Sequence, residues 1–179
     1  MSKQTYTLNE YQIVPIRHQD RYDIMKWRNE QIYHLRQSKP LDIESQDKYF
    51  SEEINKYFEL ENPDQILFSY LENGICMGYG GLVYINWNDK NAELSFIMNT
   101  NQESNFNLHW SNFLTLIELL AFEEMGFHKI FTYAFDLRPH LYKVLDENGF
   151  HNEATLKEHC LFDNKFIDVL IHSKINKHA

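Results

Sequence analysis

Glu93 is the acidic residue whose surroundings best suit proton transfer. It stands near the start of an apolar stretch typical of a strand, and Leu94, Phe96 and Ile97 follow it. Such neighbours exclude water from a carboxylate and raise its pKa towards neutrality, as a general base requires. Ser95 falls on the same face, where it can orient a water molecule or a bound group. The structural alternatives are an acid that caps backbone groups or pairs with a surface cation, and a plain strand serine.

The histidines and cysteines predict no metal site and no nucleophilic pair. His151 and His159 are eight residues apart, whereas a zinc helix has compact spacing such as His-Glu-x-x-His. Cys160 adjoins His159, so a strand would direct their side chains to opposite faces. Cys76 and Cys160 lie in apolar contexts that indicate buried residues, and two cysteines are too few for a secreted disulfide framework.

Composition limits the class of protein. The 26 acidic and 17 basic side chains give a formal net charge of −9, which argues against nucleic acid because phosphate binding needs a basic surface. No apolar run approaches the ~20 residues that span a bilayer, and residues 1–11 have no signal-peptide core. A length of 179 residues suits one domain, residues 1–179, which we expect to be cytoplasmic.

The order of elements predicts a mixed α+β fold. Apolar runs bounded by turn residues predict seven strands, at residues 11–16, 65–71, 76–87, 92–98, 128–135, 155–162 and 166–173. Apolar residues at helical spacing predict four helices, at residues 20–27, after Ser45, ahead of Gly126, and from Pro139 to Asn148. The strand–helix–strand passage from residue 92 to 135 implies a parallel crossover inside an otherwise antiparallel sheet.

Local signals refine these elements. Asn73-Gly74 and the Asp163-Asn164-Lys165 segment predict tight hairpin turns, since Asn, Asp and Gly tolerate positive φ. Asp20 is a predicted N-cap whose carboxylate accepts a backbone N–H of the first turn. The closely spaced glycines predict a bulge or a close backbone approach. They are Gly78, Gly80 and Gly81.

Four stretches together resemble the GNAT acyltransferase superfamily, in particular its ribosomal-protein and amino-sugar N-acetyltransferase branch. They are Met25-Lys26-Trp27-Arg28-Asn29, Ala92-Glu93-Leu94-Ser95-Phe96, residues 121–130, and the C-terminal residues 145–171. No single stretch is diagnostic, but the ordered set spans nearly the whole chain. The resemblance implies a mixed, mostly antiparallel twisted sheet of about seven strands flanked by four helices.

The resemblance also implies acetyl-CoA as co-substrate, in a V-shaped split between the strands at residues 92–98 and 128–135. Splayed strands would leave the backbone groups of Phe96, Ile97 and Met98 free to bind the pantetheine amides as an added strand would. The CoA pyrophosphate would lie at the N-terminus of the following helix, where backbone N–H groups and the helix dipole favour anions.

The pyrophosphate loop departs from the family pattern. The family has Gln or Arg, two residues, Gly, one residue, and Gly or Ala, where this chain has Glu103-Ser104-Asn105-Phe106-Asn107-Leu108. Side chains at the two glycine positions crowd the approach of phosphate, and Glu103 repels it. Either the loop takes another route and Ser104, Asn105 and Asn107 with the helix N-terminus still hold CoA, or ordinary CoA binding is lost.

Further roles follow from the resemblance, each with a structural alternative. Glu93 would be the base; Leu145 occupies the place of the usual acid, so Tyr142, one turn earlier, would replace it unless it is a packed core residue. Arg138 would meet a CoA phosphate or an acidic acceptor, or else be a solvated arginine. The acceptor would contact Trp27, Arg28 and Asn29, although Trp27 also suits an apolar anchor and Arg28 an ion pair with a nearby acid.

The sequence therefore predicts an N-acetyltransferase that moves an acetyl group from acetyl-CoA to a primary amine by direct attack. The acceptor would be a small molecule such as an amino-sugar nucleotide, or a protein N-terminus. One alternative is a GNAT-shaped binding or regulatory module that has lost CoA affinity; another is transfer of a longer acyl group, or use of a non-CoA donor. We expect no nucleic acid, membrane or metal partner, and a monomer or homodimer.

Overall fold

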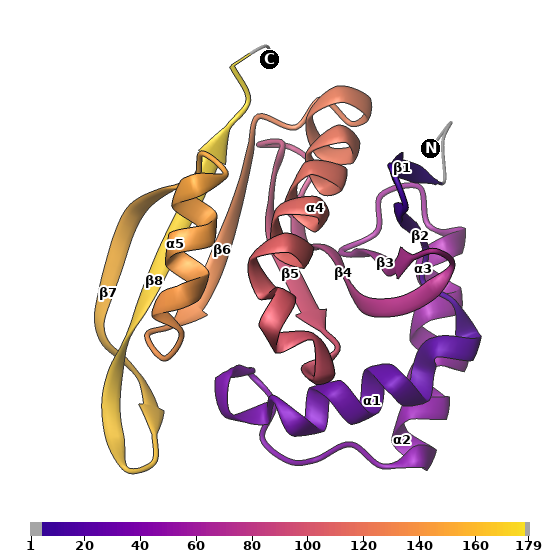
Figure 1. The fold of residues 1–179 in the computed structure, drawn as a ribbon, viewed down its shortest axis with the longest axis horizontal. Helices are drawn as coiled ribbons and strands as arrows, with labels where there is room; N and C mark the ends of the chain where they lie inside the picture. Colours follow the sequence, from indigo (N-terminus) through magenta and orange to yellow (C-terminus); the bar gives the residue numbers. More distant parts are fainter. Residues whose placement is uncertain (1–4, 178–179) are drawn as a thin grey trace.

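One eight-stranded sheet forms the centre of the computed structural model, which describes residues 5–177. Its order is β1-β2-β3-β4-β5-β6-β8-β7 (Figure 1). The strands are β1 Tyr6–Leu8, β2 Tyr11–Pro15, β3 Ile66–Glu72, β4 Ile75–Asn86, β5 Asn91–Met98, β6 Lys129–Phe135, β7 His151–Phe162 and β8 Lys165–Ile175. Neighbours are antiparallel except for β5 and β6, which are parallel. The predicted mixed, mostly antiparallel sheet is confirmed.

Strand β1 adds an eighth strand to the seven that we predicted. It pairs with β2, so that Tyr6 lies opposite Ile13, and Asn9 takes a positive φ of 53° in the connection. A strand of three residues is too short to show alternation of polar and apolar residues. Its pairing partner, rather than its own pattern, defines it.

The four predicted helical segments are present. They are α1 Arg21–Glu30; α2 Ile43–Lys48, which continues through a π-helical stretch into α3 Asn55–Glu59; α4 Phe106–Glu118; and α5 Pro139–Glu147. The second segment begins before Ser45 because Asp42 and Ser45 form a capping box, with the Ser45 N–H donating to Asp42 Oδ1 at 2.8 Å. No helix within residues 5–177 is long and apolar enough to cross a membrane.

Asp20 stands at the N-cap of α1, but its carboxylate caps no backbone N–H. It accepts from Arg17 Nε at 2.7 Å and from the Ser69 hydroxyl at 2.6 Å. Asp20 is only 4% exposed, and a buried carboxylate needs charged or strong donors. The predicted N-cap position is therefore right and the predicted hydrogen bond is wrong.

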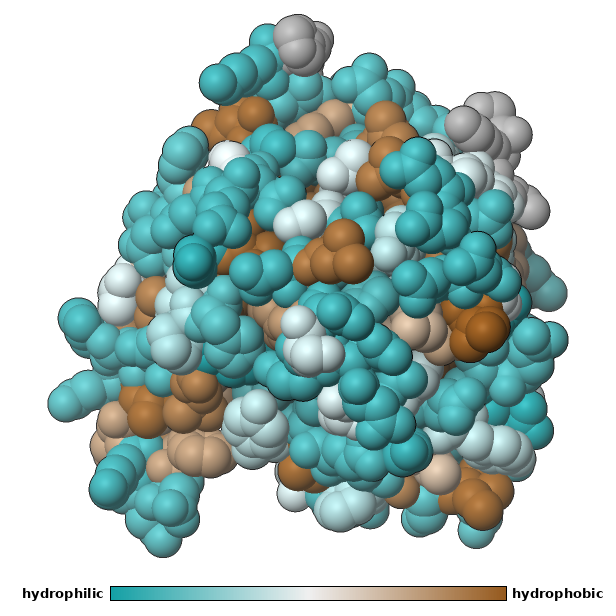
Figure 2. All heavy atoms as spheres, in the orientation of Figure 1, coloured by the Kyte–Doolittle hydropathy of each residue, from teal (hydrophilic) through white to brown (hydrophobic). Residues whose placement is uncertain are grey.

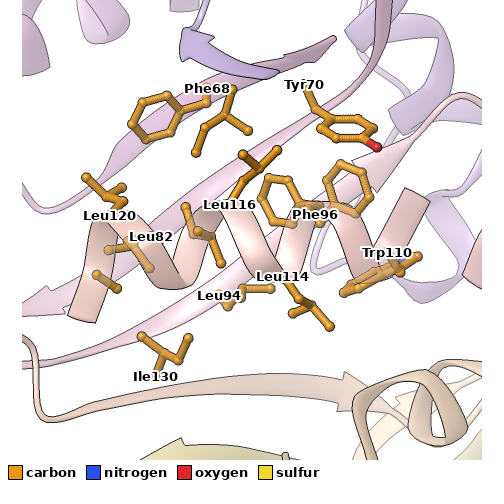
Figure 3. Packing of buried hydrophobic residues seen from close by; sticks show 14 of the residues in the cluster. Phe68, Tyr70, Leu82, Leu94, Phe96, Trp110, Leu114, Leu116, Leu120 and Ile130 are labelled. Atoms are coloured by element: carbon orange, nitrogen blue, oxygen red, sulfur yellow. The ribbon is translucent and has the colours of Figure 1, made fainter. Parts of the chain in front are cut away.

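Helices cover both faces of the sheet. The larger core packs α4 and α5 on one face, and a second core packs α1 and the α2–α3 segment on the other. Figure 3 shows Phe96, Trp110 and Leu114 in the larger core, where α4 lies against β5. Phe96 stacks on Phe113 with ring centroids 4.0 Å apart. The face shown in Figure 2 is mostly hydrophilic with scattered hydrophobic areas, one of them at lower left near the end of the β7–β8 hairpin, where Leu161 and Phe166 are exposed.

The middle of the sheet is closely packed around glycines, as predicted. A Cβ at Gly80 would lie 2.1 Å from the Ser95 carbonyl oxygen, and one at Gly81 would lie 2.0 Å from that of Ile66. No side chain fits at such distances. Strands β4 and β5 are therefore held closely together along their length. Because β5 follows β4, it is free to separate from β6 on its other side.

The predicted turns are confirmed. Asn73 and Gly74 have φ values of 48° and 81° between β3 and β4, and Asp163 and Asn164 have values of 46° and 59° between β7 and β8. Positive φ at both central residues is the type I′ requirement. These two turns set the register of β3 with β4 and of β7 with β8.

Candidate active site

A split opens between β5 and β6. The two strands pair only over their first residues, with Asn91 opposite Lys129 and Glu93 opposite Phe131. Beyond that point β5 continues to pair with β4 as far as Met98, and β6 with β8 as far as Phe135. The strands thus stay ordered while they separate, which is the V-shaped arrangement that the resemblance implied.

The backbone of β5 presents hydrogen-bonding groups to this split. In an antiparallel ladder, successive residues direct their backbone groups alternately towards and away from the partner strand. Asn99 N donates to Met77 O at 2.8 Å, so Ile97 faces β4 and Phe96 and Met98 face away from it. Met98 O already accepts from Gln31 Nε2 at 2.9 Å. Of the three residues whose backbone we expected to bind pantetheine, only Phe96 and the N–H of Met98 have backbone groups available in the split. The backbone of Ile97 pairs with β4, so this residue contributes only its side chain to the split.

A cavity of about 80 Å³ occupies the split. Its walls come from β5, from β6, from the segment after α1 and from the start of α5. The lining includes residues 34–36, 93–97 and 132–135, with Trp110, Arg138 and Leu141. A larger cavity of about 270 Å³ lies between α3 and β3. It shares no residue with the split, and we assign it no role.

Three residues that line the split bury a side-chain nitrogen with no hydrogen-bond partner among residues 5–177. They are His34 Nδ1, Trp110 Nε1 and Arg138 Nε. Burial, with the nearby Arg138 guanidinium, lowers the pKa of His34 to about 3, so that the imidazole is neutral. Burial also lowers the pKa of Arg138. Neutral His34 directs Nε2 to Gln31 Oε1, which can only accept, so its Nδ1 is an unpaired acceptor. The unpaired donors are Trp110 Nε1 and Arg138 Nε; each costs about 1–3 kcal/mol, and a ligand rich in carbonyl or phosphate oxygens would satisfy them.

Glu93 lies where the strands part. It is 6% exposed, and burial raises its pKa, as the sequence predicted, although the adjacent Arg36 acts in the opposite direction. Arg36 Nη2 forms an ion pair with Glu93 Oε1. Ser95 lines the same cavity two residues along β5. A desolvated carboxylate in a cleft is the arrangement expected of a general base.

The side chains of the Trp-Arg-Asn signature contact other parts of the protein itself. Trp27 is buried in the second core, as an apolar anchor would be. Arg28 donates from Nε to Gln37 Oε1 at 2.8 Å and from Nη1 to the Tyr79 hydroxyl, so its partners are neutral groups and not the acid that we expected. Asn29 exchanges hydrogen bonds with the backbone of Leu41, at 2.8 and 2.7 Å. Together these contacts fix the segment between α1 and α2.

Tyr142 points its hydroxyl to the end of β6. The hydroxyl donates to Phe135 O at 2.9 Å, and the ring stacks on His172 at 5.1 Å. Burial, with the nearby Asp136 carboxylate, raises the pKa of Tyr142 above its usual value. Leu145, in the usual place of the acid, is fully buried. Tyr142 is not among the residues that line the cavity.

The loop before α4 forms a 3₁₀ segment, residues 100–105, ahead of Phe106. The Phe106 ring is buried between Trp110 and His140, at centroid distances of 5.7 and 4.5 Å, whereas Leu108 is 49% exposed. Asn105 donates to Gln102 and does not cap the helix. The Phe106 N–H donates to Glu103 O, and no side chain caps the N–H groups that follow it, which therefore suit an anion.

Other residues in this region are exposed or form no cluster. Ser104, Asn105 and Asn107 are exposed around the start of α4. Glu103 is exposed and lies 3.7 Å from His140 Nε2. Within residues 5–177, no three His, Cys, Asp or Glu side chains gather as metal ligands would.

Sequence reasoning missed Arg36, His34 and Trp110. His34 ends a short 3₁₀ turn, residues 32–34, and Arg36 lies in the irregular segment after it; neither pattern gives a sign that this part of the chain reaches the split. Trp110 belongs to a helix in which most residues are apolar, so nothing in the sequence distinguishes it from a core residue or indicates that its indole N–H faces the split.

Solved structures share this architecture. A spermidine N-acetyltransferase from Vibrio cholerae, in complex with CoA and spermine, superposes with a TM-score of 0.79 at 16% identity, over 94% of this chain and 97% of that one. Variant forms of a spermidine/spermine N-acetyltransferase from the same organism give a TM-score of 0.76 at 20% identity, over 94% and 95% of the chains. At these identities the likeness establishes the fold.

A sequence model of the GNAT acetyltransferase domain matches residues 13–171. That range contains both walls of the split, Glu93 and the start of α4. The chain therefore belongs to the GNAT acetyltransferases, enzymes that take their acetyl group from acetyl-CoA.

Proposed function

We propose that this protein transfers an acetyl group from acetyl-CoA to a primary amine on a small cationic molecule, by direct attack. The observation that carries this proposal is the desolvated carboxylate of Glu93 at the closed end of the β5–β6 split. Its neighbour in the split, Phe96, offers free backbone groups for a thioester ligand. Base and donor site are thus on one strand, within the span of a bound thioester.

The residues of the split fit the CoA arm. The Phe96 backbone can bind the amides of the pantetheine chain as a strand would, and the nitrogens of Trp110 and Arg138 lack the acceptors that those amides and the phosphates carry. The uncapped start of α4 supplies N–H groups without needing the glycines of the usual loop. CoA supplies the activated acetyl carbon.

The chain supplies proton transfer and orientation. Glu93 accepts a proton from the ammonium, directly or through a water held by Ser95, and the free amine then attacks the thioester carbonyl. The new C–N bond forms as the C–S bond breaks, with no covalent enzyme intermediate. The Met98 N–H polarises the carbonyl. Tyr142 is the candidate donor of a proton to the leaving thiolate, a role for which its hydroxyl has to turn away from Phe135 O and into the split.

The acceptor class follows from charge. A net charge of −9 attracts cations to the surface. The Vibrio cholerae enzyme, which shares this fold with a TM-score of 0.79, is in complex with the polyamine spermine. A polyamine, an amino-sugar nucleotide and a protein N-terminus each present a primary amine, but the nucleotide carries anionic phosphates, so the charge of this protein favours the polyamine. In this proposal Trp27, Arg28 and Asn29 do not contact the acceptor directly. They hold in place the segment between α1 and α2, whose residues 34–36 line the split.

Thiol release from acetyl-CoA, followed across these three amine classes, tests the proposal. We expect release with at least one class and a loss of at least about 100-fold in Glu93→Gln, because general bases contribute roughly 10²–10⁴-fold. The closely packed Phe106 ring favours a second candidate, a binding module without CoA affinity. Millimolar CoA separates the two: a ligand at 100 times its Kd stabilises by ~2.7 kcal/mol, whereas the module would show no thermal shift.

A further inference from the structure

The guanidinium of Arg36 lies between two tyrosine rings. Its Cζ is 5.0 Å from the Tyr84 ring centroid and 4.6 Å from that of Tyr133, and Nη2 pairs with Glu93 Oε1. Both ring distances are within the ~6 Å that cation–π contacts require. Glu93, Tyr84 and Tyr133 therefore form a cation box, and in the free protein an arginine side chain of the same chain occupies it.

Three adjacent strands build this box. Glu93 is on β5, Tyr133 on the neighbouring β6, and Tyr84 on β4 at the irregularity between Val83 and Asn86. Tyr84 has a φ of +49° and is 67% exposed. A bulky residue in left-handed conformation is a strained outlier, and bulges re-aim side chains. The same bulge places Ile85 in the core, with its N–H donating to Asp64 O at 3.1 Å, and brings the Tyr84 ring against the cation.

Burial distinguishes the carboxylate of the box from the arginine that occupies it. The Glu93 side chain is 8% exposed, whereas the Arg36 side chain is 43% exposed and comes from an irregular segment. The residues that follow it are anchored independently of it, Gln37 by Arg28 and Leu41 by Asn29. Arg36 can therefore leave the box by side-chain rotation, while the segment stays in place.

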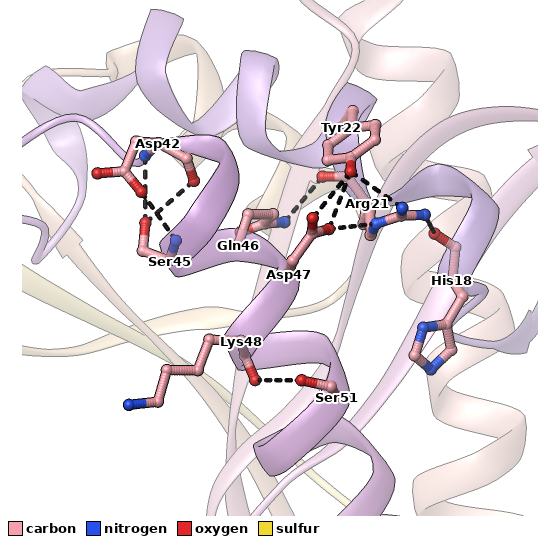
Figure 4. A network of polar contacts seen from close by, with 9 residues as sticks. All are labelled: His18, Arg21, Tyr22, Asp42, Ser45, Gln46, Asp47, Lys48 and Ser51. Carbon is pink, nitrogen blue, oxygen red and sulfur yellow. Dashed lines mark hydrogen bonds and ion pairs between the residues drawn. The ribbon is translucent and has the colours of Figure 1, made fainter.

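A surface cluster shows what an ordinary arrangement of the same groups looks like. Arg21 pairs with Asp47 at 2.6 Å and lies 4.1 Å from the Tyr22 ring centroid (Figure 4). There the carboxylate is 45% exposed and lines no cavity. Of these two clusters, the one at Arg36 combines a desolvated carboxylate with a cavity wall, which is why we treat it as a binding site.

We propose that the cation box of Glu93, Tyr84 and Tyr133 is the receptor for the acceptor's cationic group, and that Arg36 occupies it until an acceptor displaces it. This inference rests on the proposed function. It adds Tyr84 and Tyr133 as specificity-determining residues, selecting ammonium or guanidinium groups over neutral amides and hydroxyls. It also makes Arg36 an internal competitor that keeps the base occupied when no amine is present.

A binding experiment tests the box without acetylation. n-Propylguanidinium reproduces the outer part of an arginine side chain, and its effect on the melting temperature is measured for the wild type, Arg36→Ala and the control Arg21→Ala. We expect Arg36→Ala to be stabilised by millimolar probe at least about three times more than the wild type or the control. Adding Tyr84→Asn, which removes the ring but tolerates positive φ, should abolish the gain. Equal shifts in all variants, or a gain that survives loss of the ring, overturn the proposal.

Kinetics then separate displacement from positioning. If Arg36 competes with the amine, Arg36→Ala lowers the KM for the amine by about tenfold, equivalent to ~1.4 kcal/mol, and leaves kcat within about twofold. A fall in kcat with unchanged KM overturns the proposal, because it would mean that Arg36 serves to orient Glu93. If the wild type acetylates no amine, the proposed function fails. The binding experiment with n-propylguanidinium then decides by itself whether the cation box binds a cation in place of Arg36.

Discussion

Replacing Glu93 with Gln separates its catalytic role from its structural one. The two side chains have nearly the same shape, so the substitution keeps the packing of β5 and removes only the charge and the ability to accept a proton. The ion pair with Arg36 is lost, but that arginine is 43% exposed and can be hydrated. We therefore expect activity to fall while the fold is retained.

The magnitude distinguishes a base from a structural acid. Loss of a general base costs roughly 10²–10⁴-fold in rate, which corresponds to ~2.7–5.5 kcal/mol of transition-state stabilisation. Loss of a half-exposed ion pair alone costs about 0–1 kcal/mol. A fall in kcat/KM of less than about fivefold would therefore place Glu93 among the structural acids.

The same substitution, Glu93→Gln, should lower activity but raise the stability of the fold at neutral pH. Burial raises the pKa of Glu93 in the folded state, so the folded protein holds this proton more tightly than the unfolded chain does. The stabilisation is complete below the unfolded pKa of about 4.3 and is lost as pH rises through the folded value. Glu93→Gln has no such loss, so its free energy of unfolding relative to the wild type should increase from pH 4 to pH 7. Of the groups that face Glu93, Arg36 remains a cation in this range, and Tyr133, whose pKa is raised to about 12, remains neutral.

Glu118→Gln is the matched control. Glu118 is also a glutamate whose pKa burial raises and which pairs with a cation, Lys174, at 2.7 Å, but it lies outside the split. Urea unfolding at each pH and thiol release at neutral pH are measured for both variants. We expect Glu118→Gln to keep full activity and, because burial raises the pKa of Glu118 too, to show the same rise in relative stability from pH 4 to pH 7. Equal activity losses in the two variants would refute the reasoning.

Three further substitutions test the CoA side of the split. Glu103→Gln removes an exposed charge beside the start of α4 and should lower the Kd for CoA by about two- to fivefold at low salt, with the gain disappearing at high salt; titration calorimetry at two salt concentrations measures this. Arg138→Met removes a buried guanidinium whose Nε is unpaired, so the free protein should melt no lower than the wild type while CoA binds at least about tenfold more weakly; a lower melting temperature without weaker binding would contradict this. Gly80→Ala puts a Cβ 2.1 Å from Ser95 O, so it should cost ~1–3 kcal/mol in urea unfolding and, by displacing β5, weaken CoA binding; an unchanged unfolding midpoint would show that β4 does not fix β5.

Elements with short-range signals could be predicted from the sequence. Asn73-Gly74 determines its own turn through positive φ, and Pro139 begins α5 because its missing N–H costs nothing in the first turn. The three glycines of β4 marked the close approach of neighbouring strands. The resemblance located the split and Glu93, and the burial of Glu93 follows from the apolar residues beside it.

Contacts between distant residues could not be predicted in this way. The carboxylate of Asp20 is bound by Ser69, 49 residues away, and Glu93 by Arg36, 57 residues away. No periodic pattern marks the segment that carries Arg36, because it is neither helix nor strand. An irregular segment takes its path from its anchors, here Asn29 and Leu41, and these appear only when the chain is folded.

Amide hydrogen exchange at Phe96 and Ile97, followed by NMR with and without millimolar CoA, tests the central claim most directly. The Ile97 N–H pairs with β4 in either state and serves as the internal reference, whereas the Phe96 N–H faces the split and has no strand partner. We predict that CoA slows exchange at Phe96 by at least about tenfold and leaves Ile97 unchanged. Exchange at Phe96 that is unaffected by CoA, or already as slow as at Ile97 in its absence, would contradict a pantetheine arm bound along β5.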